Sequence, residues 1–324
     1  MTNIFVAAAF ACALTAIFGR LLIPVLRALK AGQSIRESGP TWHNYKAGTP
    51  MMGGLMFVAA SALVLVLNAF TMEDYSVFYV LILSLCFGFI GFLDDLTKLK
   101  YKRNLGLTSA QKAMLQMAVS AIFLYAMYRG GMDTHLYIPF VNVSYELHPI
   151  LYNFFAMFVL VGCVNAVNLT DGVDGLCGSV TIPVMIFFTA AAAAQGKFDL
   201  ALLPATLVGG LIAYLFYNWH PAKVFMGDTG SLFLGGVVCA MAFALEMPLI
   251  LILVGFIYIC ETMSVILQVG YFKLTHGKRL LKMSPLHHQF EMCGWKEVKI
   301  CIVFTSITVL MCLLAWFGIS GLVA

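Results

Sequence analysis

The chain has 324 residues, of which 61% are hydrophobic and only 10% are charged, and its formal net charge is +4. Soluble domains carry about 25% charged and about 45–50% apolar residues, so this composition excludes an ordinary soluble protein and makes a membrane the expected solvent. The small positive charge is accounted for by basic membrane loops and gives no reason to expect a nucleic-acid partner.

Apolar runs recur along the whole chain, each near the length of about 20 residues that crosses a bilayer as a helix. The ten expected spans are 4–26, 51–70, 76–93, 110–128, 149–167, 176–194, 200–217, 231–246, 248–270 and 300–320. Because the connections between them are mostly short, we expect a single all-α, polytopic membrane domain over residues 1–324.

The first run, 4–26, lacks a basic n-region and a convincing cleavage site, which favours a first span over a removable signal. With ten spans, both termini share one side of the membrane. Of the 19 Lys and Arg residues, only Arg129 and Lys197 fall in loops on that side. Because basic loops face the cytoplasm, we expect both termini to be external.

The predicted external side carries little polar sequence. Segment 136–147, LYIPFVNVSYEL, alternates in hydrophobicity and predicts a small β-hairpin. The acidic residues on this side stand singly or in one pair and indicate no chemistry: Glu73, Asp74, Asp133, Glu146, Asp199 and Glu246. The nine cysteines form no Cys-x-x-Cys pair, so we expect free thiols.

The predicted cytoplasmic side carries five polar segments, each where a span meets the cytoplasm. They are HNYKAGTPMMGG (43–54), DDLTKLKYKRNLGLTSAQK (94–112), NAVNLTDGVDGLCGS (165–179), YNWHPAKVFMGDTGS (217–231) and KRLLKMSPLHHQFEMCGW (278–295). A bundle of helices would bring all five around one cavity. We therefore expect an active-site cavity on the cytoplasmic face.

Asp94 and Asp95 stand side by side where the third apolar run stops. Neighbours on a helix point about 100° apart, so both carboxylates would face one pocket only obliquely. Lys98 follows Asp94 at a spacing that allows an ion pair. A solvated helix end is the alternative interpretation.

Two glycine-rich segments carry further aspartates. In NLTDGVDGL, a glycine follows Asp171 and Asp174, which is typical of a turn whose exposed amides and carboxylates bind a polar ligand or a metal. In MGDTGSL, Asp228 precedes a span expected to start near Ser231, whose positive end favours phosphate. A carboxylate there requires a cation, and Mg²⁺ shared with substrate phosphates is the usual arrangement. Helix capping is the alternative for both segments.

The segment SPLHHQFE places His287 and His288 in a basic loop. Zinc is disfavoured for want of a cysteine or further carboxylate at ligand spacing, so the imidazoles would donate to phosphate or lie against a carboxylate. An ordinary basic loop is the alternative. Glu261 lies inside the ninth run, with Gln268 two turns later, and is either functional or simply paired within the bundle.

The co-occurrence of these groups on one predicted face indicates a site for a phosphorylated, metal-bound substrate at the bilayer surface. The sequence resembles the bacterial phospho-N-acetylmuramoyl-pentapeptide transferases (translocase I), within the polyprenyl-phosphate N-acetylhexosamine-1-phosphate transferase superfamily. The resemblance covers nearly the whole chain through GTPMMGG, FLDDLTK, NAVNLTDGVDGL, PAKVFMGDTGSL, ETMSVILQV and SPLHHQFEMCGW.

The resemblance implies an enzyme of the bacterial plasma membrane that uses Mg²⁺. It would transfer phospho-MurNAc-pentapeptide from UDP-MurNAc-pentapeptide to undecaprenyl phosphate, giving lipid I and UMP for peptidoglycan synthesis. It also implies contact with membrane lipid and a homodimer.

By motif, the resemblance implies catalytic roles for Asp94, Asp95, Asp228, Lys112 and His287, with Asp228 as the Mg²⁺ ligand. Further residues match the substrate site, with Phe225 stacking on uracil: Lys46, Lys98, Asn168, Asp171, Asp174, Asn218, Phe225, Gly227, Gln268 and His288. Because a phosphate monoester has a second pKa near 6, our hypothesis is that Asp94 organises Lys98 and the metal surroundings rather than removing a proton. A covalent phospho-aspartate route is the competing mechanism.

Two departures from the family pattern leave alternatives open. Gln289 stands where a third consecutive histidine is usual, and Met51 replaces a hydroxyl-bearing residue. Glutamine cannot carry charge, so a catalytic role at that position is doubtful. The alternatives are a related transferase that uses UDP-GlcNAc and, from another class, a secondary transporter, whose site would lie near the midplane.

Overall fold

The computed structural model describes residues 3–29, 46, 48–101, 106–129 and 134–323. Parts of the first two polar segments and Asp133 lie outside this range. The described chain is almost entirely helical, which confirms the all-α class. Its long helices are α1 (Ile4–Ala28), α2 (Leu55–Asn68), α3 (Ser76–Tyr101), α4 (Ser109–Arg129), α5 (Pro149–Thr170), α6 (Leu176–Ala194), α7 (Phe198–Asn218), α8 (Gly227–Ala244), α10 (Phe256–Leu274) and α12 (Glu297–Gly318).

Short elements complete the chain: η2 (Ala69–Thr71), η3 (Pro248–Ile250), α9 (Leu251–Val254), α11 (Leu286–Met292), α13 (Ser320–Val323), β1 (His135–Ile138) and β2 (Val143–Glu146). β1 and β2 pair antiparallel, with His135 opposite Glu146 and Ile138 opposite Val143. This pairing confirms the predicted hairpin. The nine cysteines are free, as expected.

All ten predicted spans fall on helices, but fewer than ten helices have the length and apolar character of a membrane span. Within the described residues seven qualify: α1, α3, α5, α6, α7, α8 and α12. α2 has only 14 residues, and α4 carries Gln111, Lys112 and Gln116 near its start. The number ten therefore stays a prediction.

The predicted span 248–270 is not one straight helix. It divides into η3, α9 and α10, and the first part bends by 81° against α10. A Cβ on Gly255, at the break, would lie 2.6 Å from the carbonyl oxygen of Leu251. Glycine thus permits the close backbone approach at this bend.

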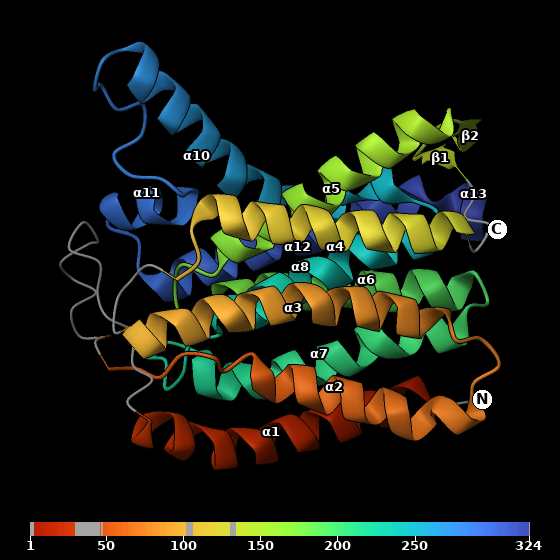
Figure 1. Cartoon of the computed structure of the whole chain (residues 1–324), viewed down its shortest axis with the longest axis horizontal. Helices are drawn as coiled ribbons and strands as arrows, with labels where there is room; N and C mark the ends of the chain where they lie inside the picture. The colour runs from red at the N-terminus through yellow and green to blue at the C-terminus, as the bar shows by residue number, and fades with distance from the viewer. Residues whose placement is uncertain (1–2, 30–45, 47, 102–105, 130–133, 324) are drawn as a thin grey trace.

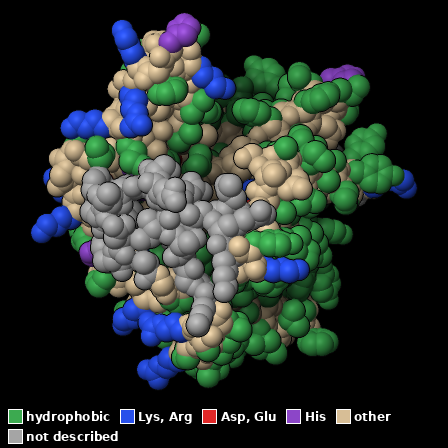
Figure 2. Space-filling view, turned by 60° about the vertical axis from the view of Figure 1, so that its left-hand side comes forward, with side chains coloured by type: hydrophobic (Ala, Val, Ile, Leu, Met, Phe, Trp, Pro, Cys, Tyr) green, Lys and Arg blue, Asp and Glu red, His purple; other side chains and the backbone are tan. Residues whose placement is uncertain are grey.

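The bundle is organised around α8, which is buried along almost its whole length. α8 packs against α3 and α5, while α7 packs against α1 and α6, and α12 packs against α6. Both termini and the hairpin lie at one end of the bundle, and α11 lies at the other (Figure 1). Lys and Arg side chains are spread over the face that includes the second end (Figure 2). We call this second end the polar end.

Candidate active site

Three aspartates from two helices meet at the polar end. Asp94 and Asp95 lie near the end of α3 and Asp228 at the start of α8, and one carboxylate oxygen of each lies within 4.8 Å of the others. The Lys98 Nζ lies 2.6 Å from Asp94 Oδ2, 3.1 Å from Asp228 Oδ2 and 3.6 Å from Asp95 Oδ1. The predicted ion pair between Asp94 and Lys98 is confirmed.

Two further helices hold Asp228. The Lys112 Nζ, from α4, lies 2.8 Å from Asp228 Oδ2 and 3.3 Å from Asn168 Oδ1. The Asn168 side chain, from α5, donates to Asp228 Oδ1 (2.9 Å) and to Ser231 Oγ (2.8 Å). We name these residues the aspartate–lysine cluster: Asp94, Asp95, Lys98, Lys112, Asn168 and Asp228.

α8 starts earlier than predicted, at Gly227 rather than near Ser231, so Asp228 lies in the first turn of the helix. The carboxylate of Asp95 accepts hydrogen bonds from the N–H groups of Asp228 (3.2 Å) and Thr229 (3.0 Å) and from the Thr229 hydroxyl (2.7 Å). Asp95 therefore caps α8 from the neighbouring helix. The Asp228 side chain remains available to pair with Lys98 and Lys112. The capping interpretation of Asp228 is wrong.

Gly227 makes this cap possible. Its φ of +75° lies in the left-handed region, and a Cβ there would lie 2.6 Å from Asp95 Oδ2. Both conditions require glycine. The group that approaches the Gly227 backbone closely is therefore the Asp95 carboxylate.

The cluster is buried but keeps one accessible carboxylate. Asp94 and Asp95 are 3% and 1% exposed, so the solvated helix-end interpretation is wrong. The Asp228 side chain is 18% exposed. Three carboxylates face two ammonium groups, which leaves an excess of negative charge, and oxygen ligands are those that Mg²⁺ prefers. The residues present therefore fit Mg²⁺, with Asp228 as the most accessible ligand.

Asp171 and Asp174 lie in the predicted turn between α5 and α6. The N-cap of α6 is Gly175, without a side-chain bond, so neither aspartate N-caps that helix; Asp171 is instead the C-cap residue of α5. Within the described part of the chain, the Asp171 carboxylate has no ion pair or hydrogen bond. Burial, and then the negative charges of Asp228, Asp95 and Asp174, raises the pKa of Asp171 from 3.8 to about 8. An additional cation at this turn would relieve that repulsion.

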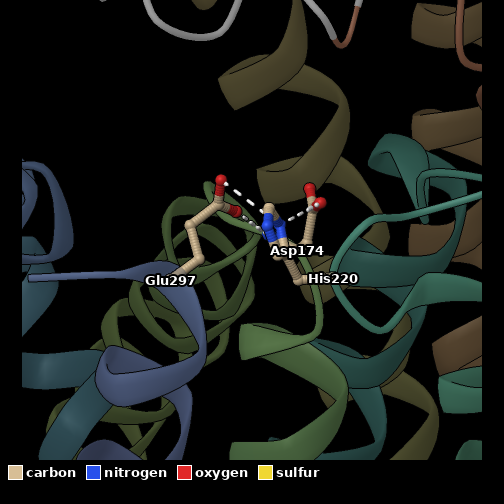
Figure 3. Close-up of side chains that lie close together, drawn as sticks. All are labelled: Asp174, His220 and Glu297. Carbon is tan, nitrogen blue, oxygen red and sulfur yellow. Dashed lines mark hydrogen bonds and ion pairs between the residues drawn. The ribbon is translucent and has the colours of Figure 1, made fainter.

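Asp174 belongs to a second charged group that the sequence did not predict as a unit. The Lys46 Nζ lies 2.8 Å from Asp174 Oδ1 and 2.7 Å from Glu297 Oε2. The His220 Nδ1 lies 3.1 Å from Asp174 Oδ2 and 3.7 Å from Glu297 Oε1 (Figure 3). Backbone N–H groups complete the group: Asp174 donates to Glu297, and Ala222 donates to Asp174.

We name Lys46, Asp174, His220 and Glu297 the loop cluster. One oxygen or nitrogen of each of its three potential metal ligands lies within 4.8 Å of the others. Lys46 already offsets one carboxylate charge there, and His220 offsets the other when it is protonated. Sequence analysis missed His220 and Glu297 because they come from segments far apart along the chain. Each had one indication in the sequence: His220 lies inside the polar segment 217–231, and Glu297 lies just after the segment 278–295.

Asn218 and Phe225 lie beside the loop cluster. The Asn218 side chain accepts a hydrogen bond from Gly175 N (3.0 Å) and donates one to Val224 O (2.9 Å), so it joins two loops. The Lys46 Nζ lies 6.0 Å from the centroid of the half-buried Phe225 ring. The backbone of Phe225 also pairs with Pro50 and Gly53, which brings residues 50–53 beside the segment that contains Phe225.

His287 and His288 lie in a short helix, α11, rather than in the predicted loop. His287 is 3.1 Å from Glu261 through its Nδ1, so Glu261 has a partner within the bundle. His288 Nδ1 lies 2.6 Å from Glu291. Gln268 Oε1 accepts hydrogen bonds from the N–H groups of residues 280 and 281. The described contacts of His288 and Gln268 are therefore with neighbouring segments rather than with the aspartate–lysine cluster.

Comparison with known proteins shows the family to which the chain belongs. The family model described as glycosyl transferase family 4 matches residues 77–246, a range that contains the whole aspartate–lysine cluster. A phospho-N-acetylmuramoyl-pentapeptide-transferase of Clostridium acetobutylicum is 47% identical over 93% of this chain and 94% of its own. Relatives of the same name from Clostridium perfringens (48%, covering 93% of both chains) and Geobacillus thermodenitrificans (42%, covering 96% of both) are also similar.

Proposed function

Because this chain belongs to the phospho-N-acetylmuramoyl-pentapeptide-transferase family, we propose that it transfers phospho-MurNAc-pentapeptide from its UDP derivative to undecaprenyl phosphate. The products are lipid I and UMP. The observation that carries this function is the aspartate–lysine cluster, in which residues from α3, α4, α5 and α8 converge at one end of a membrane helix bundle. A transporter site near the midplane does not fit that position, and the names of the relatives favour the muramoyl donor over UDP-GlcNAc.

The reaction is a phosphoryl transfer, for which positioning and charge neutralisation supply most of the catalysis. A phosphate oxygen of the lipid attacks the sugar-side phosphorus of the donor, and UMP leaves. Lys98 and Lys112 both lie within 3.1 Å of Asp228, so this carboxylate holds two ammonium groups at one place. In our proposal these ammonium groups offset the charge of the transferring group.

Asp228, with Asp94 beside it, would hold Mg²⁺, which when bound supplies neutralisation of pyrophosphate charge. Asp95 contributes least to metal binding because its oxygens are engaged by the first turn of α8.

Asp94 has little capacity to act as a base. Its Oδ1 accepts from Leu107 N (2.7 Å), and its Oδ2 lies 2.6 Å from Lys98. We therefore assign Asp94 to the placement of Lys98.

The nucleotide part of the donor would bind at the loop cluster and the neighbouring turn. Phe225 offers a half-buried ring for stacking on uracil, and Lys46 lies next to it. Asn218 fixes the loops on either side, and Asp171 would face the ligand as a carboxyl that has no partner among the described residues. This arrangement separates binding of the nucleotide from the reacting phosphates.

We further propose that the polar end faces the cytoplasm, that both termini are external and that the enzyme is a homodimer. The distribution of Lys and Arg supports the orientation, together with the position of both termini at the opposite end (Figure 1). Dimerisation rests on family resemblance alone.

The test is UMP release by the purified full-length protein in detergent, with undecaprenyl phosphate, Mg²⁺ and either UDP-MurNAc-pentapeptide or UDP-GlcNAc. We expect release with the muramoyl donor only, and loss of release when EDTA removes the metal. Release with UDP-GlcNAc alone would transfer the protein to the related branch, and release with neither donor would overturn the enzyme assignment. Exchange of labelled UMP into the donor without lipid would support the covalent route.

A further inference from the structure

Glu261 and His287 form a buried carboxylate–imidazole contact between α10 and α11. Glu261 is 0% exposed and His287 is 1% exposed. The Glu261 Oε2 lies 3.1 Å from the His287 Nδ1, and the His287 backbone N–H donates to Oε1 (3.2 Å). One carboxylate thus lies beside both the ring and the backbone of the same histidine, and its hydrogen bonds are with the backbone N–H.

The charge of Glu261 identifies which ring nitrogen carries a proton. A buried carboxylate is costly unless it is paired and hydrogen-bonded. In the described part of the chain, the ion-pair partner of Glu261 is His287 and no Lys or Arg. The tautomer of a histidine follows from what its other nitrogen contacts. Glu261 therefore keeps a proton on Nδ1 and leaves Nε2 as the nitrogen directed at the rest of the site.

The Nε2 atom of His287 lies against the turn between α5 and α6. A Cβ built on Gly172 would lie only 2.0 Å from this nitrogen, so the imidazole edge directly faces the backbone between Asp171 and Asp174. Both ring nitrogens are buried and neither has a hydrogen-bond partner among the described residues, but Nδ1 has the Glu261 carboxylate 3.1 Å away, whereas Nε2 has no charged neighbour in the described ion pairs. Buried polar atoms without a partner are rare. A partner supplied by the bound donor would satisfy this nitrogen.

We propose that Glu261 is a positioning residue for His287. It holds the imidazole of α11 with Nδ1 protonated and Nε2 directed at the turn that contains Gly172, where a hydroxyl group of the donor would donate a hydrogen bond to Nε2. This inference deepens the role of the site and rests on the proposed function. It adds a residue of α10, the helix that follows the 81° bend, to a site whose other residues come from α3, α4, α5 and α8.

A double-mutant cycle tests this proposal by kcat and donor KM for lipid I synthesis. The variants are Glu261→Gln, His287→Ala and the two combined. Because Glu261 acts through His287, we expect Glu261→Gln to lower kcat on the order of 10²-fold with a smaller change in KM. In the His287→Ala background the same change should have almost no further effect. Glu246→Gln is the matched control, since Glu246 is exposed at the other end of α8.

Multiplicative losses in the double variant, or an unchanged kcat in Glu261→Gln, would overturn the inference. General structural damage would lower activity equally in both backgrounds, so the cycle separates damage from positioning. If Glu261→Gln does not fold, Glu261→Asp gives the same cycle, because it keeps the charge but withdraws it by one methylene. The wild-type assay separates failure of the proposed function from failure of the positioning role. If wild-type protein makes no lipid I, the proposed function itself is refuted.

Discussion

The aspartate–lysine cluster and the loop cluster both pair carboxylates with lysine, but they are built differently. In the first, the charged side chains come from helices, and the Asp228 side chain remains 18% exposed. In the second, Lys46, Asp174 and His220 lie in connecting segments, and the Glu297 and Asp174 carboxylates accept N–H groups of two different connecting segments. The first cluster presents charge to a ligand, and the second holds loops together.

The difference predicts two kinds of mutational effect. Side chains on packed helices keep their geometry through the reaction, so damage to the aspartate–lysine cluster should lower kcat. Carboxylates that tie loops together shape the binding surface, so damage to the loop cluster should raise the KM of the donor. If a variant of one cluster mainly changes the kinetic constant expected for the other cluster, the two clusters act as one.

The largest effect should come from Asp228→Asn. This change removes the charge that holds Lys98 and Lys112 together and the most accessible metal ligand of the cluster. We expect kcat to fall by about 10²–10³-fold, with weaker dependence on Mg²⁺ concentration. Initial rates of UMP release over a Mg²⁺ titration measure both. An unchanged Mg²⁺ dependence would place the metal elsewhere.

The next effect concerns Asp94→Asn, for which we expect a kcat loss of roughly 10²-fold that is the same at pH 6 and pH 8. The lipid phosphate has a second pKa near 6, so the nucleophile is mostly deprotonated over this range. A lost base would be replaced by hydroxide as the pH rises, whereas a misplaced Lys98 would not be restored. Substantial recovery at pH 8 would make Asp94 a general base.

Glu297→Gln probes the loop cluster. Glutamine keeps an oxygen that accepts from Asp174 N but loses the charge that pairs with Lys46. Charge-assisted hydrogen bonds contribute about 1.5–3 kcal/mol, so we expect the donor KM to rise roughly tenfold, while kcat falls much less. Kinetics with varied donor at saturating lipid measure the split. An equal loss in kcat, with KM unchanged, would contradict the division between the clusters.

A smaller effect concerns stability and Asp171. Its pKa is raised to about 8 in the folded protein, so between about pH 4 and pH 8 the folded state binds more protons than the unfolded state. The wild-type protein therefore loses stability from this group as the pH rises through that window. Asp171→Asn removes the loss, so its melting temperature should exceed that of the wild type by a few degrees, and by more at pH 8.5 than at pH 5.5.

Thermal unfolding in detergent with EDTA measures this difference, because a bound cation would offset the repulsion at Asp171. Addition of Mg²⁺ should reduce the advantage of the variant. A difference that does not change with pH would show that Asp171 is stabilised in its charged form by a partner outside the described residues.

Short-range patterns predicted the helical membrane architecture and part of the site. The length of the apolar runs placed the helices, and the spacing of Asp94 and Lys98 predicted their ion pair. The start of α8 and the loop cluster depend instead on distant contacts. Asp95 accepts from an N–H 133 residues away, and Glu297 accepts from one 123 residues away. No local spacing contains that information.

The smallest effect should come from Gln289, where the sequence departs from the family pattern. Its Oε1 accepts a hydrogen bond from Lys282 N (2.7 Å), so the side chain folds the segment before α11 back onto that helix. A histidine nitrogen accepts such a bond as well, so Gln289→His should keep kcat within about threefold, whereas Gln289→Leu should lose about 0.5–1.5 kcal/mol of stability. Kinetics and melting temperatures of both variants measure this. A large gain in kcat for the histidine variant would show that charge at this position takes part in catalysis, and that His287 and His288 do not suffice.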